Sequence, residues 1–479
     1  MVERQQTWGC NKSNTLGWCN KLSSVQDVVN EKQIWEVLEE TRKPSSIIIS
    51  EILDKALEKK GLSLKDVGFL LNTEDKELIE KMFKVSGEIK KQIYGERLVF
   101  FAPLYLSSYC INDCEYCGFH RRNPVQRKKL TLEEVREQTR ILINMGHKRL
   151  LLEFGEHPVE NPIDYVTSVI KTIYDTKCGK GEIRRVNVNI AATSVENYKK
   201  LKAAGIGTYQ LFQETYHRET YEKLHHGPKA DYERQLFAHD RAIEAGIDDV
   251  GLGVLFGLFD YKFDVLALVS HSQYLERKYG VGPHTISVPR FQPAPTVDFN
   301  SSFKVSEEQL LKIISILRMA VPYTGMIITT RERPEIRAKA FEIGISQTSA
   351  ASKTNPGGYG KEEGLKQFSL QDHRSVDEVL KSVLEQGLIP SFCTACYRVG
   401  RTGETIMKLL KSGEIHNLCR PNAILTFKEY LEDYASNEVK QLGLKIIEKY
   451  LKQIPDVVMR RETEIRLERI ENGERDLYF

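Results

Sequence analysis

Short β-rich runs alternate with helical or irregular segments along about 250 residues of this chain. Strands joined by such crossovers pair in parallel, with right-handed connections. Eight units in this span predict an α/β fold of the (β/α)8 barrel type, and an open doubly wound sheet is the alternative. The predicted strands cover residues 98–106, 149–154, 184–190, 207–213, 249–257, 284–291, 324–330 and 343–349.

Helical patterns flank this predicted barrel on both sides. Before it, apolar residues recur three and four apart, as in SIIISEILDKALEKK. After about Gln367 the alternation stops, and segments such as VDEVLKSVLEQGL and NAILTFKEYLEDYA predict helices. We therefore divide the chain into a poorly specified tail (1–33), an N-terminal helical segment (34–92), the barrel (93–366) and a helical C-terminal domain (367–479).

Composition is that of an ordinary soluble globular protein. Hydrophobic residues make up 41% and charged residues 28% of the chain, which excludes a largely disordered protein. The net charge of +3 argues against a nucleic-acid partner. The longest nearly apolar stretch, Val250 to Phe259, is too short to cross a bilayer. The N-terminal MVERQQTWGCNKSN lacks the apolar core of a secretory signal, so we expect a cytoplasmic location and no membrane partner.

The cysteines concentrate in two groups of three. Nine cysteines are too few for a disulfide scaffold of this length. In a reducing compartment, clustered cysteines are more often metal ligands or catalysts than structural disulfides. The remaining three have no predicted role: Cys10, Cys19 and Cys178.

The first group has C-x3-C-x2-C spacing and consists of Cys110, Cys114 and Cys117. It follows the first predicted strand, at the end of the barrel where active sites are built. Three thiolates on one loop can bind three irons of a 4Fe–4S cluster and leave the fourth iron open to an external molecule. The alternative is a zinc site, but zinc ribbons usually carry two C-x2-C pairs, and no second pair lies nearby.

This motif, with an aromatic residue before its last cysteine, resembles that of the radical SAM superfamily. The resemblance implies that the open iron binds S-adenosylmethionine (SAM) and that Tyr116 approaches the adenine. Gly155 and Glu156 end the second strand, like the GGE-type motif that meets the SAM amino group, although phenylalanine replaces the first glycine. Glu214 resembles the acidic residue that binds the ribose hydroxyls, and Arg234 the arginine that pairs with the SAM carboxylate.

The second group, Cys393, Cys396 and Cys419, has C-x2-C-x22-C spacing. Two thiolates from one turn and a third from a distant segment define one face of a metal site. A fourth ligand such as histidine would complete a zinc site, so structural zinc and an iron–sulfur cluster both remain open on spacing alone.

With both cysteine groups, the chain resembles the tyrosine lyases of FeFe-hydrogenase maturation. The resemblance runs from about residue 34 to the C-terminus. The resemblance implies cleavage of the Cα–Cβ bond of L-tyrosine to p-cresol and dehydroglycine. It also implies an auxiliary 4Fe–4S cluster with a fifth iron, where dehydroglycine yields carbon monoxide and cyanide. The product would be an iron carbonyl cyanide precursor of the hydrogenase H-cluster, passed to other maturation proteins.

Three further residues are candidates for this chemistry. Arg290, on the sixth strand, is our candidate for binding the tyrosine carboxylate, because a guanidinium can hold a carboxylate through two parallel bonds. His284 opens the same strand at the opposite end of the barrel, where its imidazole would bind the fifth iron. His271, on the preceding helix, is the competing candidate for that iron.

Two other functions remain open. The related tyrosine lyase of thiamine biosynthesis also cleaves tyrosine, but it passes dehydroglycine to thiazole formation and lacks the second cysteine group. A non-catalytic scaffold that carries clusters for a partner would make no 5′-deoxyadenosine from SAM.

Overall fold

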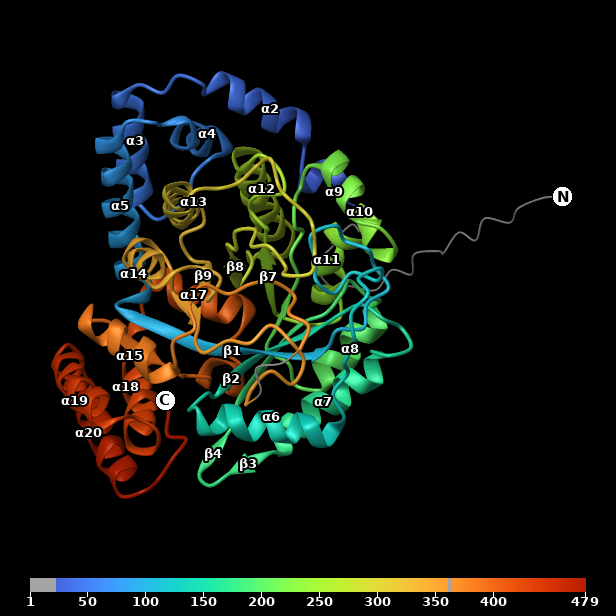
Figure 1. Cartoon of the computed structure of the whole chain (residues 1–479). Helices are drawn as coiled ribbons and strands as arrows, with labels where there is room; N and C mark the ends of the chain where they lie inside the picture. The colour runs from blue at the N-terminus through green and yellow to red at the C-terminus, as the bar shows by residue number, and fades with distance from the viewer. Residues whose placement is uncertain (1–22, 361–363) are drawn as a thin grey trace, which may run out of the picture.

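The computed structural model describes residues 23–360 and 364–479 (Figure 1). Most of the expected N-terminal tail, with Cys10 and Cys19, lies outside these ranges. Residues 23–33 lie inside them and include helix α1 (Val25–Val28) and the beginning of α2 (Glu31–Glu40). The division of the chain into four parts remains a prediction.

A group of helices before the first strand packs on one side of the barrel, coloured blue in Figure 1. The side chains of Ser45, Ser63 and Asp75 accept backbone N–H bonds and so fix where three of these helices begin. The group packs against the barrel helices α12 and α13, and its helix α5 also contacts α14 (Pro334–Ile343). Its bounds and those of the two barrel helices are α3 (Ser46–Leu57), α4 (Leu64–Asn72), α5 (Lys76–Tyr94), α12 (Tyr261–Tyr279) and α13 (Glu307–Ala320).

The eight predicted strands all form, and they close into one parallel barrel. The last barrel strand returns to the first through the pairing of Gln347–Ser349 with Val99–Phe101. This confirms the predicted TIM-type barrel. The strands are β1 (Arg97–Ser107), β2 (Arg149–Phe154), β5 (Arg185–Asn189), β6 (Thr208–Gln210), β7 (Asp249–Gly253), β8 (Thr285–Ser287), β9 (Gly325–Ile328) and β10 (Gln347–Ser349).

Helices connect these strands and cover the outside of the barrel, and a small hairpin (β3, Lys177–Cys178; β4, Gly181–Glu182) precedes β5. Cys178 lies in this hairpin, where its Sγ is 3.1 Å from Asn144 Oδ1. The other connecting helices are α6 (Leu132–Asn144), α7 (Ile163–Asp175), α8 (Val195–Ala203), α9 (Arg218–Leu224), η1 (Pro228–Ala230), α10 (Tyr232–Leu236), α11 (Ala238–Glu244) and α14 (Pro334–Ile343).

Besides the two short strands of this hairpin, one strand of the main sheet was not predicted, β11 (Ile389–Ser391), in the region expected to be helical. It pairs in parallel with Arg97–Val99 of β1. Val99 also pairs with Gln347 of β10, so β10 and β11 lie on opposite edges of β1. The edge that binds β11 is the one that pairs with β2 further along the strand. Three residues with a central proline give no strand pattern, and such a proline is tolerated at a sheet edge.

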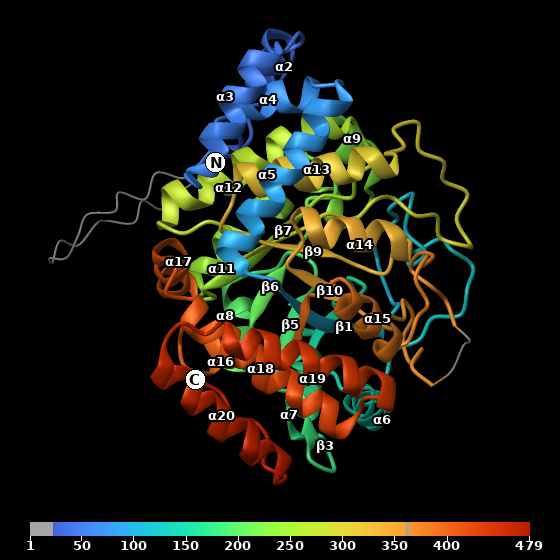
Figure 2. The ribbon, with the colours of Figure 1, turned by 90° about the vertical axis from the view of Figure 1, so that its left-hand side faces the viewer.

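The C-terminal helices lie on one side of the barrel, coloured orange to red in Figure 2. Their attachment to β11 brings them to the amino-terminal end of β1. None of the helices in the described ranges combines the length and the hydropathy of a membrane span. The helices are α15 (Val376–Glu385), α16 (Ala395–Arg398), α17 (Gly403–Ser412), α18 (His416–Asp433), α19 (Asn437–Lys452) and α20 (Val457–Glu471).

Candidate active site

The loop after β1 carries the first cysteine group and is held by backbone bonds to two other segments. The N–H of Ile111 donates to the Glu156 carbonyl (2.8 Å), and the N–H of Asp113 donates to the His226 carbonyl (3.0 Å). The Asp113 carboxylate in turn accepts the Arg122 N–H (2.7 Å). The loop is therefore fixed against the carboxyl end of β2, as expected for a barrel active site.

The three thiols of this loop form a donor set suited to a cluster. Burial raises the pKa of Cys110 and of Cys114, and raises that of Cys117 to about 11. A nearby cation, Lys229, acts in the opposite direction and favours the thiolates. In the described ranges no three histidine, cysteine or acidic side chains are close enough to share one metal ion. A 4Fe–4S cluster does not need that, because each thiolate binds its own iron.

Three of the predicted SAM-binding residues, Gly155, Glu156 and Arg234, lie around this loop. Glu156 accepts hydrogen bonds from Asn112 Nδ2 (2.7 Å) and from Arg234 Nη2 (2.6 Å), so the predicted glutamate and arginine are partners here. A Cβ on Gly155 would lie 2.3 Å from the Tyr109 carbonyl oxygen, so only glycine fits between the strand and the loop. The SAM contacts of these residues stay predictions.

Tyr116 and Glu214 border the cavity at the carboxyl ends of the strands. The Tyr116 hydroxyl lies 2.8 Å from Nε2 of the buried His225. Glu214 has φ +69°, a left-handed conformation that is strained for a residue with a side chain. Its Oε1 accepts a hydrogen bond from Lys229 Nζ at 2.6 Å. Sequence reasoning missed Lys229, which lies in the short 3-10 helix η1 and belongs to no motif.

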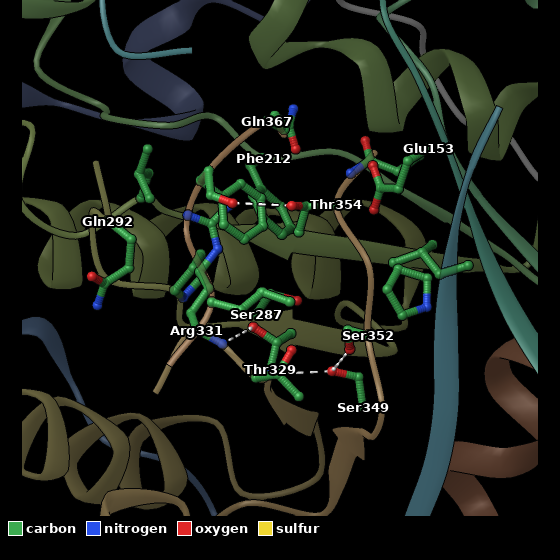
Figure 3. A pocket seen from close by; sticks show the side chains of 18 of the residues that line it. Glu153, Phe212, Ser287, Gln292, Thr329, Arg331, Ser349, Ser352, Thr354 and Gln367 are labelled. Carbon is green, nitrogen blue, oxygen red and sulfur yellow. Dashed lines mark hydrogen bonds between the residues drawn. The ribbon is translucent and has the colours of Figure 1, made fainter. Parts of the chain in front are cut away.

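We call this space the carboxyl-end cavity (Figure 3). Polar side chains from several strand ends line it, together with aromatic rings. Those used below are Tyr105, Glu153, Asn189, Arg331 and Phe368. A closed barrel with one mixed polar and apolar cavity at this end is the usual setting of a small-molecule site.

Arg290 is held away from this cavity by an ion pair. Its Nε donates to both carboxylate oxygens of the buried Glu332 (3.0 and 3.1 Å), and its Nη1 donates to the Val305 carbonyl (3.0 Å). The arginine that lines the cavity is Arg331, whose guanidinium lies over the Phe368 ring. Burial lowers the pKa of Arg331, and Tyr105 and Glu214 act against that shift. Several arginines follow β9 in TTRERPEIR, and the sequence does not show which one faces inward.

The second cysteine group borders a separate space at the amino ends of the strands, which we call the amino-end cavity. Cys393 follows β11, Cys396 lies in α16 and Cys419 in the first turns of α18. Burial raises the pKa of Cys393, whereas a hydrogen bond from Cys396 lowers that of Cys419. The three predicted ligands thus line one cavity.

Two arginines from the barrel strands also line the amino-end cavity. Arg149 Nη2 donates to the Cys393 carbonyl at 3.0 Å. Arg97 lowers the pKa of both Cys393 and Cys419 by its charge. The cavity therefore suits an anionic group such as a thiolate-bound cluster.

His284 lines the amino-end cavity, on the side of the barrel strands. Its Nε2 lies 2.9 Å from the Tyr397 hydroxyl, and its Nδ1 lies 3.6 Å from Asp249 Oδ1. Burial lowers the pKa of His284 and so favours the neutral imidazole that binds metals. The competing candidate, His271, is buried in α12, where its Nδ1 lies 2.9 Å from the Tyr216 hydroxyl.

An apolar layer lies between the two cavities inside the barrel. It consists of Phe101, Leu151 and Ile327, which contact one another and border the carboxyl-end cavity. The residues two positions earlier on β1 and β2, Val99 and Arg149, border the amino-end cavity. Side chains two apart point to the same face of a strand, so the layer separates the two spaces within one interior.

Comparisons with known proteins agree with this architecture. The chain matches the radical SAM superfamily over residues 104–267 and the biotin and thiamin synthesis associated domain over residues 287–389. A curated relative, 2-iminoacetate synthase of Salmonella typhimurium, is 32% identical over 356 residues, which cover 74% of this chain and 93% of the relative.

Two solved structures resemble nearly the whole chain. A crystal structure of HydG, a maturase of the FeFe-hydrogenase, is 57% identical with a TM-score of 0.93, and the match covers 95% of this chain and all of that one. The FeFe-hydrogenase maturase HydG from Carboxydothermus hydrogenoformans is 38% identical with a TM-score of 0.82, covering 93% of this chain and all of that one. This protein therefore belongs to the HydG family of radical SAM enzymes.

Proposed function

We propose that this protein cleaves the Cα–Cβ bond of L-tyrosine to p-cresol and dehydroglycine. In a second step, dehydroglycine gives carbon monoxide and cyanide at an auxiliary cluster, for an iron carbonyl cyanide precursor of the FeFe-hydrogenase H-cluster. The observation that carries the proposal is the pair of cavities in one barrel, each bordered by cysteines of a different group. The curated relative supports the first step, since 2-iminoacetate is dehydroglycine.

At the first site, Cys110, Cys114 and Cys117 would hold the 4Fe–4S cluster that the radical SAM family implies. When bound, this cluster and SAM supply a 5′-deoxyadenosyl radical. The chain orients SAM through the predicted contacts: Gly155 and Glu156 at the amino group, Arg234 at the carboxylate, Glu214 at the ribose and Tyr116 at the adenine. A buried carboxylate that is already held by Lys229 is well placed to accept hydroxyl protons without reorganising.

For the tyrosine carboxylate, we now assign Arg331 in place of Arg290. The Arg290 guanidinium already binds a buried carboxylate, so it has no free fork for a substrate. Arg331 lines the carboxyl-end cavity and lies beside an aromatic ring. The closed barrel keeps water from the reacting substrate.

At the second site, Cys393, Cys396 and Cys419 would hold the auxiliary cluster. His284 is our ligand for the fifth iron, since it lines the same cavity as the three thiols. Asp249 near its Nδ1 is the kind of partner that orients a metal-binding histidine. The iron product would pass to other hydrogenase maturation proteins.

The first test is coupling between SAM cleavage and tyrosine cleavage. Iron-reconstituted protein receives SAM, tyrosine and dithionite without oxygen, and 5′-deoxyadenosine and p-cresol are quantified. We expect both products, with p-cresol absent when tyrosine is left out. A scaffold protein would make no 5′-deoxyadenosine, and SAM cleavage without p-cresol would mean that the substrate is not tyrosine.

A further inference from the structure

One carboxylate in the carboxyl-end cavity has no part in the assignments above. Glu153 lies on β2, two residues after Leu151, and both side chains border the cavity. It is only three residues before Glu156, at the end of the strand that reaches the cysteine loop. Its side chain therefore lies between the predicted SAM site and the interior of the barrel.

The charges around Glu153 distinguish it from the other two glutamates of the site. Glu156 and Glu214 each have a cation at 2.6 Å, namely Arg234 and Lys229. Among the described residues, no lysine or arginine nitrogen lies within ion-pair distance of Glu153. The side chain that hydrogen-bonds to it is the neutral amide of Asn189. The cavity thus contains a carboxylate that has no ion-pair partner in the part of the chain that the structure describes.

The groups that face Glu153 come from several elements. Burial raises its pKa to about 8, and the charge of Glu214 adds to this shift. The hydrogen bond from Asn189 and the more distant charge of Arg331 act against it. Tyr105, on the neighbouring strand, has its own pKa raised by burial and by Glu153. A carboxyl group with this balance is a much stronger base than one in water.

We propose that Glu153 binds the α-amino group of the amino-acid substrate and accepts one proton from it. The assignment rests on the proposed function and extends it to the substrate's head group. The step balances as ammonium plus carboxylate giving neutral amine plus carboxylic acid, with no change in oxidation state. The hydrogen atom that the radical then takes comes from a neutral N–H bond.

Arg331 completes the recognition of the head group. Figure 3 shows Glu153 and Arg331 on different sides of the cavity. The Glu153 carboxylate and the Arg331 guanidinium match the ammonium and carboxylate charges of an amino acid. A ligand that lacked one of these two charges would leave the matching protein group buried without a partner. The position of Glu153 near Glu156 places the amino group on the SAM side of the substrate.

The test compares two ligands that differ only in the amino group. L-tyrosine and 3-(4-hydroxyphenyl)propionate are bound to the SAM-loaded, reconstituted protein in anaerobic equilibrium dialysis. In Glu153→Gln we expect the tyrosine affinity to fall about 30-fold or more, as for truncation of a buried charge pair. The affinity for the deaminated ligand should not fall. The matched control is Glu133→Gln, an exposed glutamate of α6, which should change neither affinity.

The pH dependence of the unmodified protein gives a second readout. Because the pKa of Glu153 is raised, its anionic form appears as the pH rises through about 8. Between pH 6.5 and 8.5, chosen to span roughly that value, tyrosine binding should therefore strengthen, since the anion attracts the ammonium group. Binding of the deaminated carboxylate should weaken over the same range. Both slopes should vanish in Glu153→Gln.

Parallel slopes for the two ligands in the unmodified protein would overturn the assignment, even if the variant did not fold. Equal losses of both ligands in a folded Glu153→Gln protein would also overturn it. Failure of the proposed function looks different. In that case the unmodified protein would neither bind nor cleave tyrosine at any pH.

Discussion

Arg149 and Glu153 lie on the same strand, β2, and line different cavities of one barrel. Four residues of a strand span about 13 Å, so the two cavities are close enough for a small product to pass between them. The strand thus links a cationic end beside the second cysteine group to an acidic end beside the first. Leu151, halfway between, belongs to the apolar layer that separates them.

Loss of a first-group cysteine should abolish all radical chemistry. Cys110→Ala, Cys114→Ala or Cys117→Ala removes one of the three proposed cluster ligands, and 5′-deoxyadenosine formation should fall to background. Cys178→Ala is the matched control, since this thiol lies in the β3–β4 hairpin and should leave the rate unchanged. A first-group variant that still cleaves SAM would contradict the assignment.

Loss of a second-group cysteine should separate the two steps. In Cys393→Ser or Cys396→Ser, p-cresol should still form, because the carboxyl-end cavity is intact. Carbon monoxide release, measured by its binding to deoxymyoglobin, should end. Variants that lose p-cresol entirely, while still folded, would show that the roles of the two cysteine groups are wrongly assigned.

The two histidine candidates should differ in their effects. His284→Leu should lower the iron content of the reconstituted protein by about one atom per chain, if four-iron clusters account for the remainder. Carbon monoxide release should fall with it, and p-cresol should persist. His271→Leu removes the partner of the buried Tyr216 hydroxyl and should instead cost about 1–3 kcal/mol of unfolding free energy. The reverse pattern would favour His271.

The apolar layer offers a test of transit inside the barrel. Leu151→Phe adds volume between the cavities at a stability cost of about 1–3 kcal/mol. We expect p-cresol to form as before while carbon monoxide falls, because the first product no longer passes. Leu151→Ala, which widens the layer at a cost of about 2–5 kcal/mol, is the control and should retain both products. Equal carbon monoxide from the two variants would mean that the product travels by another route.

Substitutions of Arg290 and of Arg331 should have different effects. Arg290→Met leaves Glu332 buried without its cation and should lower stability by about 3–5 kcal/mol, measured by chemical unfolding. Arg331→Met should leave stability nearly unchanged and weaken tyrosine binding about 30-fold or more. If Arg290→Met weakened tyrosine binding in a stable protein and Arg331→Met did not, Arg290 would be the residue that binds the tyrosine carboxylate.

The barrel was predictable because its signal is repeated. Eight strand runs separated by helical segments leave few topologies. Seven of the predicted runs contain the observed strand, and β1 extends one residue beyond its run at each end. β11 was not predictable, because three residues around Pro390 carry no period. It pairs with Arg97–Val99 of β1, the part of that strand edge that precedes the pairing with β2.

The cysteine groups were predictable for a similar reason, since spacing within a loop is local. Whether a single side chain points into the barrel is not determined by the residues next to it in the sequence. Arg290 and Arg331 both follow barrel strands, and tertiary packing alone decides that one binds Glu332 and the other lines the cavity. Glu153 carried a weaker signal, an acidic residue inside the apolar run RLLLEF, that could have been read as functional.

The most direct test of the account measures both products of one anaerobic reaction. Protein shown to hold both clusters receives SAM, tyrosine and dithionite, and p-cresol and carbon monoxide are quantified together. The account predicts both products, with carbon monoxide lost in Cys393→Ser. Abundant p-cresol without carbon monoxide would contradict the second step and indicate a lyase that delivers dehydroglycine, as in thiamine biosynthesis.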